Sequence, residues 1–174
     1  MIYFDVHGTL FEYDYSVYKR MPVWYEEGSH PFANDVPLGK MQGVLKILCD
    51  REIKSQTLCR ISKGSEIAMA EQRQDVINNM DKHYPFYPKD KVCFCEGDKG
   101  LAVGRPLNIS DILVDDYQPN LILWARAGGT PVKVLNGVNS LMTWYGLFID
   151  SRTSPDVTAQ YLINIDAEYN RRLK

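Results

Sequence analysis

Short apolar runs alternate along this chain with longer segments in which apolar residues recur every three or four positions. The short runs predict buried strands, and the longer spacing predicts helices. Strands are expected over residues 2–4, 55–62, 92–95, 109–115, 131–135 and 146–150, and helices over 39–51, 65–80, 119–127 and 155–172. The alternation favours an α/β protein: a three-layer, doubly wound, mostly parallel sheet with helices on both faces.

Residues 11–38 interrupt this pattern after the first strand and follow neither a helical nor a strand period. Long connections in compact domains commonly form lids or binding loops, so we interpret 11–38 as a small cap insertion. The segment is rich in aromatic residues, among which Tyr13, Trp24 and Tyr25 are candidates for stacking on a flat substrate group. Burial of these rings within the insertion itself is the alternative for each of them.

Composition narrows the class of protein. A chain of 174 residues with 45% apolar residues can bury one core, so we expect a single domain over 1–174. The net charge of −2 argues against a nucleic-acid polymer or an anionic membrane as partner. The sequence shows neither a membrane span nor a cleavable leader, which favours a cytoplasmic protein. We expect Cys49, Cys59, Cys93 and Cys95 to be free thiols, because their spacing forms no metal-binding or redox motif.

Carboxylates follow two of the expected strands. Asp5 comes directly after Ile2-Tyr3-Phe4, and Asp115-Asp116 follows Ile112-Leu113-Val114. Ligands of open α/β sheets bind outside the carboxyl ends of the strands, and carboxylates that converge there attract a hard cation such as Mg²⁺. Taken singly, Asp5 could cap a turn and Asp115-Asp116 could cap a helix. Their occurrence at two strand ends favours a metal site.

Several motifs also resemble a known family. They are Asp5-x-His7-Gly8-Thr9-Leu10, Ser62 after the second strand, Lys99 in Glu96-Gly97-Asp98-Lys99, and Asp115-Asp116. In this order they are similar to the four motifs of the haloacid dehalogenase (HAD) superfamily of phosphohydrolases, and the match spans the chain. The stretch from Ile112 to Leu121, with Trp124, Ala127-Gly128-Gly129 and residues 132–137, resembles small bacterial and phage members of the 5'(3')-deoxyribonucleotidase group.

The resemblance implies a HAD-like Rossmannoid fold and phosphoryl transfer through an aspartyl-phosphate on Asp5. It implies Mg²⁺ held by Asp5, the His7 backbone carbonyl, Asp115 and Asp116. It also implies phosphate contacts from Gly8, Thr9, Ser62, Lys63 and Lys99. A hydroxyl and an ammonium suit the negative charge that spreads over a transferring phosphoryl group. Thr57 and Lys63 are the alternatives to Ser62 if the end of the second strand lies elsewhere.

His7 departs from the family pattern, because most phosphatases of the superfamily carry an acid/base Asp at that position. An imidazole with a usual pKa near 6.5 can serve as acid and base near neutrality. A positive ring beside Mg²⁺ and Lys99 would be disfavoured by like charge. Two functions therefore stay open: a Mg²⁺-dependent phosphomonoesterase acting on a small phosphorylated metabolite such as a nucleoside monophosphate, or a catalytically impaired relative that binds a phosphorylated ligand or partner. The oligomeric state stays open.

Overall fold

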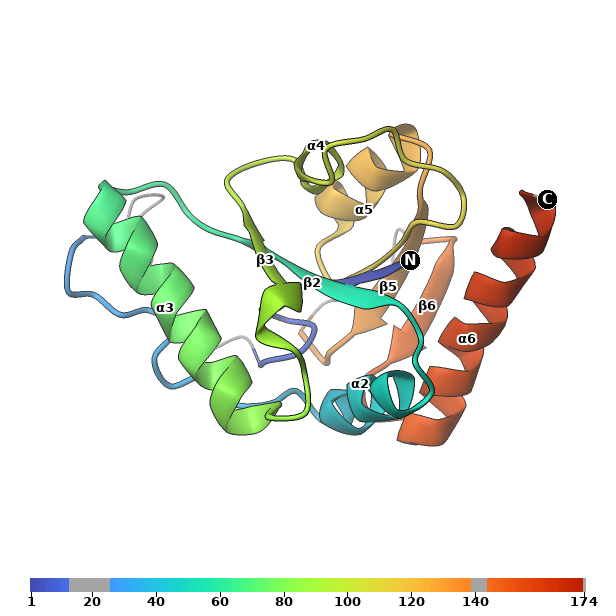
Figure 1. Ribbon diagram of the computed structural model, residues 1–174, viewed down its shortest axis with the longest axis horizontal. Helices are drawn as coiled ribbons and strands as arrows, with labels where there is room; N and C mark the ends of the chain where they lie inside the picture. The colour runs from blue at the N-terminus through green and yellow to red at the C-terminus, as the bar shows by residue number, and fades with distance from the viewer. Residues whose placement is uncertain (13–25, 139–143, 174) are drawn as a thin grey trace.

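The fold is built on one parallel sheet. The computed structural model describes residues 1–12, 26–138 and 144–173, and its sheet has six strands in the order β3-β2-β1-β4-β5-β6 (Figure 1). The strands are β1 (Ile2–Phe4), β2 (Ser55–Arg60), β3 (Val92–Cys95), β4 (Ile112–Asp115), β5 (Thr130–Leu135) and β6 (Leu147–Asp150). Every neighbouring pair is parallel. The predicted α/β class and parallel sheet are confirmed.

Helices cover both faces of this sheet. They are α2 (Met41–Asp50), α3 (Glu66–His83), α4 (Lys99–Ala102), α5 (Gln118–Arg126) and α6 (Pro155–Arg172), and a 3-10 turn spans Lys89–Lys91. In Figure 1, α2 lies below the sheet and α6 runs along its right-hand side, whereas α4 and α5 lie above it. β1 lies between β2 and β4. The strands after it are added first on one side, as β2 and β3, and then on the other, as β4 to β6, which is the pattern of a doubly wound sheet.

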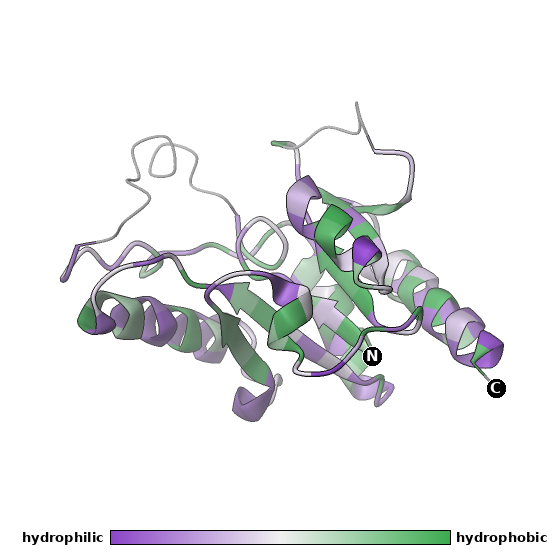
Figure 2. Ribbon diagram, turned by 90° about the horizontal axis from the view of Figure 1, so that it is seen from above, coloured by the Kyte–Doolittle hydropathy of each residue, from purple (hydrophilic) through white to green (hydrophobic). Residues whose placement is uncertain are grey.

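Alternate residues of the central strands serve the two faces. Ile2 and Phe4 of β1 pack in the larger core with residues of α2, α3 and α6. Tyr3 packs on the other side with Trp124 of α5, the two rings edge to face at 5.2 Å between centroids. Burial on both faces explains why β1 and β4 are continuous apolar runs. Figure 2 shows the strands as largely hydrophobic segments and the outer faces of the helices as hydrophilic.

Several elements differ from the sequence prediction. β2 ends at Arg60 and not at residue 62, and α3 continues to His83 and not to residue 80. β4 begins at Ile112 and not at residue 109, because residues 108–111 form a turn. Asp111 accepts a hydrogen bond from the Asn108 amide at 3.0 Å and two from Arg105 at 2.7 Å each, and these contacts draw residues 108–111 away from the ladder. α4 was not predicted, since its four residues show no period; Asp98 caps it by accepting from the Gly100 amide at 2.7 Å.

The described parts of the 11–38 segment leave the fold and return to it at one place. The Glu12 amide donates to the Val36 carbonyl at 2.7 Å, and the Leu38 amide donates to the Leu10 carbonyl at 2.8 Å. Residues 26–32 then lie along α3, where the Gly28 amide donates to Glu71 at 2.8 Å. Tyr13, Trp24 and Tyr25 fall outside the described residues. The cap insertion therefore stays a prediction.

Two further observations concern the described part of the chain. None of its helices combines the length and the apolar character needed to cross a bilayer. All four cysteines are free thiols; Cys59 and Cys95 are buried, and Cys49 and Cys93 are partly buried.

Candidate active site

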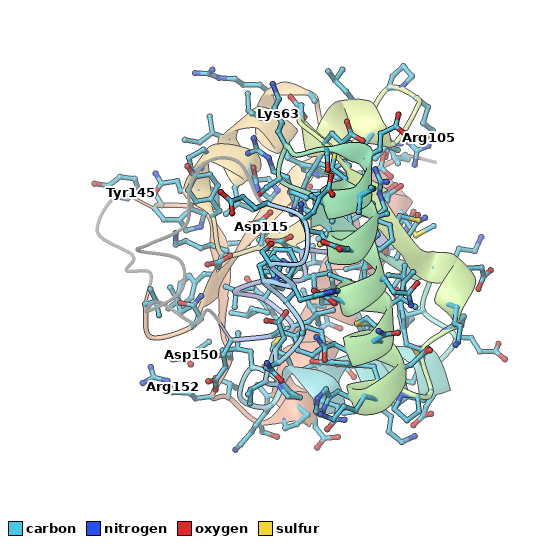
Figure 3. The ribbon with its side chains drawn as sticks, turned by 90° about the vertical axis from the view of Figure 1, so that its left-hand side faces the viewer. Lys63, Arg105, Asp115, Tyr145, Asp150 and Arg152 are labelled. Atoms are coloured by element: carbon cyan, nitrogen blue, oxygen red, sulfur yellow. The ribbon has the colours of Figure 1, made fainter. Side chains whose placement is uncertain are left out.

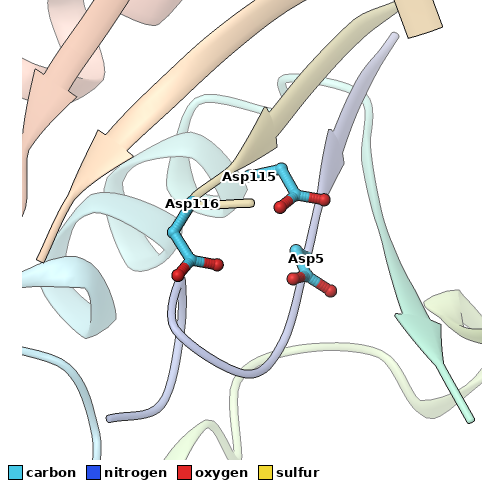
Figure 4. A group of neighbouring side chains, drawn as sticks. All are labelled: Asp5, Asp115 and Asp116. Atoms are coloured by element: carbon cyan, nitrogen blue, oxygen red, sulfur yellow. The ribbon is translucent and has the colours of Figure 1, made fainter. Parts of the chain in front are cut away.

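Three carboxylates meet where β1 and β4 end. Asp5 follows β1 directly, Asp115 is the last residue of β4, and Asp116 comes next. The two strands are neighbours in the sheet, and the Asp5 amide donates to the Val114 carbonyl at 2.9 Å. One carboxylate oxygen from each residue lies within 4.8 Å of the others (Figure 4). All three residues are buried, so the sheet itself assembles an acidic cluster at its carboxyl edge.

Lys99 connects two of these carboxylates. Its Nζ lies 2.5 Å from Asp5 Oδ1 and 2.8 Å from Asp115 Oδ2. Lys99 is the first residue of α4 and is almost completely buried, so the short helix that the sequence did not predict is what delivers the ammonium. Burial alone would lower the pKa of Lys99, but the Asp115 and Asp5 carboxylates raise it above its usual value. The Lys99 side chain is therefore a permanent cation within the cluster.

Burial and the neighbouring charges also change the pKa values of the carboxyl groups. Burial, and then the charge of Asp115, raise the pKa of Asp5 to about 6, and these effects outweigh the opposing Lys99 ammonium. Burial, and then Asp115 and Asp5, raise the pKa of Asp116 to about 8. The protein by itself therefore holds more negative charge here than its own cations stabilise. A divalent cation with a preference for oxygen ligands would relieve this repulsion, and the carboxylate donor set fits Mg²⁺.

Asp115 plays a different part from its neighbours. Its Oδ1 accepts from the Tyr117 amide at 2.7 Å, and its Oδ2 accepts from Asn120 at 2.9 Å as well as from Lys99. These bonds tie the end of β4 to the first turn of α5 and to α4. Asp115 thus orients Lys99 and fixes the position from which Asp116 extends.

A tight turn brings Asp116 close to the backbone after β1. Gly8 adopts a left-handed φ of +80°, and a Cβ atom there would collide with the Asp116 carboxylate, so the turn requires glycine on both counts. Asn136, just after β5, donates through Nδ2 to the Gly8 carbonyl at 2.9 Å and to Asp116 Oδ2 at 3.0 Å. Lys133, a buried residue of β5, donates to the Asp116 carbonyl at 3.2 Å. Side chains in β5 and just after it therefore hold both walls of the cluster.

His7 is buried, and its ring is enclosed by protein groups. The ring stacks on Phe32 with 3.8 Å between centroids and 24° between planes. Its Nε2 lies 3.0 Å from Asp35 Oδ2, without the alignment of a hydrogen bond, and its Nδ1 lies 3.7 Å from Cys59 Sγ. Phe32 and Asp35 belong to the returning end of the 11–38 segment. That segment therefore contributes directly to the surroundings of the catalytic candidate His7.

The remaining candidates lie at the carboxyl end of β2 and in the turn after β1. Ser62 follows β2, and its amide and carbonyl are both bound by Gln72 of α3, at 3.0 and 3.1 Å. Lys63 is exposed at the N-terminal end of α3 (Figure 3), and the hydroxyl of buried Thr9 has no hydrogen-bond partner among the described residues. Thr57 lies inside β2 and bonds Lys91 and Cys93, whereas β2 ends at Arg60 and Ser62 and Lys63 follow in the loop before α3.

Sequence reasoning missed five polar residues of the site: Asp35, Gln72, Asn120, Lys133 and Asn136. Lys133 and Asn136 carried a signal, because a lysine inside an apolar strand and a polar residue at its end are unusual among buried positions. Asn120 also carried one, since it lies in the first turn of the helix that follows Asp115-Asp116. Asp35 and Gln72 carried none, because their contacts depend on how the insertion and α3 pack.

Known structures resemble this fold. No protein-family model and no curated protein matches the sequence. A HAD-superfamily hydrolase from Ehrlichia chaffeensis matches with a TM-score of 0.58 and 10% identity, over 94% of this chain and 96% of that chain. A hydrolase from Pseudomonas syringae matches with a TM-score of 0.55 and 10% identity, over 92% and 98% of the two chains. The chain is thus a doubly wound α/β protein. More narrowly, its fold resembles that of the HAD-superfamily hydrolase from Ehrlichia chaffeensis.

Proposed function

We propose that this chain is a Mg²⁺-dependent phosphomonoester hydrolase that works through an aspartyl-phosphate on Asp5. The observation that carries the proposal is the Asp5, Asp115 and Asp116 cluster with the Lys99 ammonium inserted into it. A buried carboxylate held beside a fixed cation suits attack on phosphorus, because the cation opposes the charge that builds up during transfer. The likeness in fold to a HAD-superfamily hydrolase and to a second hydrolase supports the same reaction class.

The cation would be held by Asp5 and Asp116, with Asp115 and the His7 carbonyl as the further ligands that the sequence resemblance implies. When bound, Mg²⁺ supplies charge neutralisation for the acids and for the phosphoryl oxygens. The chain itself prepares the nucleophile. Lys99 binds Oδ1 of Asp5, so attack falls to Oδ2.

The reaction has two steps. In the first, Asp5 Oδ2 bonds to phosphorus as the bond to the leaving oxygen breaks, and that oxygen takes a proton from the His7 ring. In the second, water gives a proton to His7 and bonds to phosphorus, the bond to Asp5 breaks, and phosphate leaves. Lys99 and the Ser62 hydroxyl hold the phosphoryl oxygens throughout. For the substrate we propose a small phosphorylated metabolite, with a nucleoside monophosphate favoured by the resemblance of residues 112–137.

Phosphate release from a panel of nucleoside monophosphates and sugar phosphates, with and without Mg²⁺, tests this function. We expect release that needs Mg²⁺ and that falls by about 10³-fold or more in Asp5→Asn, since the nucleophile is lost. Asp81→Asn, which changes an exposed carboxylate of α3, is the matched control and should retain wild-type activity. Equal release by wild type and Asp5→Asn would overturn the proposal.

One observation favours a second candidate, a relative that binds a phosphorylated ligand without efficient turnover. Both ring nitrogens of His7 face protein atoms, Asp35 Oδ2 and Cys59 Sγ, and the ring is stacked on Phe32. A ring held this way must turn before it can protonate a leaving group. His7→Asp separates the candidates: a gain of about tenfold or more in turnover of alkyl phosphates indicates that His7 limits the reaction. An unchanged or lower rate indicates that His7 already serves as the acid and base.

A further inference from the structure

Gln72 is a completely buried amide in the middle of α3. Its Oε1 accepts from the Ser62 amide at 3.0 Å, and its Nε2 donates to the Ser62 carbonyl at 3.1 Å and to the Ala68 carbonyl at 3.3 Å. Burying an amide is unfavourable unless its hydrogen bonds are made, and here both donors and the acceptor are used. The Gln72 side chain therefore binds both the backbone amide and the backbone carbonyl of Ser62.

These two hydrogen bonds determine which groups of Ser62 remain available to a ligand. The Ser62 amide is committed to Gln72, so a phosphate can receive only the hydroxyl from this residue. Because Gln72 binds the amide and the carbonyl that flank the Ser62 Cα, it also fixes the direction in which the Ser62 side chain leaves the backbone. The last hydrogen bond between the β2 and β3 segments of the described structure runs from the Ile61 amide to the Cys95 carbonyl, at 2.7 Å, and Gln72 holds the next residue, Ser62.

The other buried polar residues of α3 have a different target. Asp75 lies 3.0 Å from the ring of His30, and Asn79 donates to the Phe32 carbonyl, so both contact the returning end of the 11–38 segment. Among the described residues, Gln72 is the buried polar residue of α3 that binds the loop after β2. The buried polar residues of α3 thus contact two parts of the described structure. Asp75 and Asn79 contact the returning end of the 11–38 segment, and Gln72 contacts the loop that carries Ser62.

We infer that Gln72 is a positioning residue for phosphate binding, acting through the Ser62 hydroxyl. The inference rests on the proposed function for the identity of the ligand, and it adds a residue that contacts neither the ligand nor the metal. A preorganised hydroxyl donates without first having to be ordered, whereas a mobile one loses entropy on binding. Loss of the Gln72 contacts should therefore weaken phosphate binding and leave the binding of Mg²⁺ unchanged.

Calorimetric titration of the full chain with inorganic phosphate, in saturating Mg²⁺, tests the inference without any turnover. Gln72→Met keeps the length of the side chain and removes all its hydrogen bonds, and we expect phosphate affinity to fall about fivefold to tenfold. Gln74→Met is the matched control: the same change at an exposed glutamine of the same helix should leave the affinity unchanged. Gln72→Leu, which also removes the acceptor and both donors without burying a charge, should give a similar loss and serves if the Met variant fails to fold.

A double-mutant cycle separates positioning from general damage. If Gln72 acts through Ser62, adding Gln72→Met to Ser62→Ala should weaken phosphate binding no further, and the Mg²⁺ affinity of all variants should stay within about twofold of wild type. Additive losses, a parallel loss of Mg²⁺ affinity, or unchanged phosphate affinity in both Gln72 variants would overturn the inference. Wild type that binds phosphate without hydrolysing esters would refute the proposed hydrolase and leave this inference standing. Wild type that binds no phosphate would refute both.

Discussion

The two halves of the candidate site are built in different ways. The acidic half, Asp5 with Asp115 and Asp116, is placed by the ends of two adjacent strands and is joined by one lysine. The other half, His7 and Ser62, is held chiefly by side chains of α3 and of the 11–38 segment, and the His7 ring also contacts Cys59 of β2. The acidic half is thus part of the sheet, whereas the second half depends on packing between elements. Damage to the two halves should therefore have different consequences.

After loss of the nucleophile itself, the largest effect is expected from Lys99→Met, which removes the cation of the acidic half and keeps most of its apolar stem. Without the ammonium, Asp5 loses its bound partner and the transferring phosphoryl group loses a fixed positive charge. We expect kcat to fall by about 10²-fold to 10³-fold. Steady-state kinetics at saturating Mg²⁺ measure it. Lys133→Met is the matched buried lysine, and because it bonds only the Asp116 carbonyl in the described structure, its loss should be at least about tenfold smaller.

Asn136→Leu should produce a smaller effect, and this effect should be confined to the affinity for Mg²⁺. Asn136 holds the Gly8 carbonyl and the Asp116 carboxylate together, so its removal should loosen both walls of the cluster. We expect the Mg²⁺ concentration for half-maximal activity to rise about 10-fold to 100-fold, with kcat at saturating Mg²⁺ changed far less. A fall in kcat that high Mg²⁺ does not restore would show that Asn136 acts on the chemistry and not on metal binding.

The third effect concerns stability and not activity, and it is a dependence of the free energy of unfolding on pH. The folded chain raises the pKa of Asp5 to about 6 and that of Asp116 to about 8, whereas an unfolded aspartate titrates near 4. Folded protein therefore retains protons that unfolded protein has released, and without a cation its stability falls as pH rises from about 4 to about 8. Each kcal/mol lost should lower Tm by about 2–4 °C.

Thermal unfolding at pH 6, 7 and 8, in a chelator or in Mg²⁺, checks this sign. Tm should fall with pH in the chelator, and Mg²⁺ should stabilise the chain most at pH 8, where the acids are ionised. Asp116→Asn removes the larger of the two shifts and should flatten the curve in the chelator. A Tm that rises with pH in the chelator would contradict the charge arrangement described for the acidic half.

The difference between the halves also explains what the sequence could predict. Asp5 and Asp115-Asp116 follow apolar runs, and parallel strands bring such ends to one edge, so the acidic half could be predicted from the pattern alone. The parallel sheet and helices α2, α3, α5 and α6 were also predictable, because short apolar runs alternate with segments of helical spacing. α4 was missed because four residues leave no periodicity, although it delivers Lys99.

The second half was less predictable because its contacts join distant parts of the chain. The resemblance to the HAD motifs indicated Ser62, but nothing in the sequence indicated that Gln72 would bind its backbone. His7 was predicted to lie beside the acids, and the expectation of repulsion from Lys99 took no account of Asp35, which the returning end of the 11–38 segment brings to 3.0 Å from the ring. Such pairs depend on tertiary packing and on a loop without a period.

The central claim is that Asp5 is the nucleophile, and covalent trapping tests it most directly. Wild-type chain is mixed in Mg²⁺ with a phosphoester that it hydrolyses. The reaction is quenched in acid within the first turnover, and the protein is digested and examined by mass spectrometry. The account predicts one added phosphoryl group on the peptide that begins at Met1, located on Asp5 and absent from Asp5→Asn. Rapid turnover with an unmodified Asp5 at every quench time, or a phosphoryl group on His7 in its place, would contradict it.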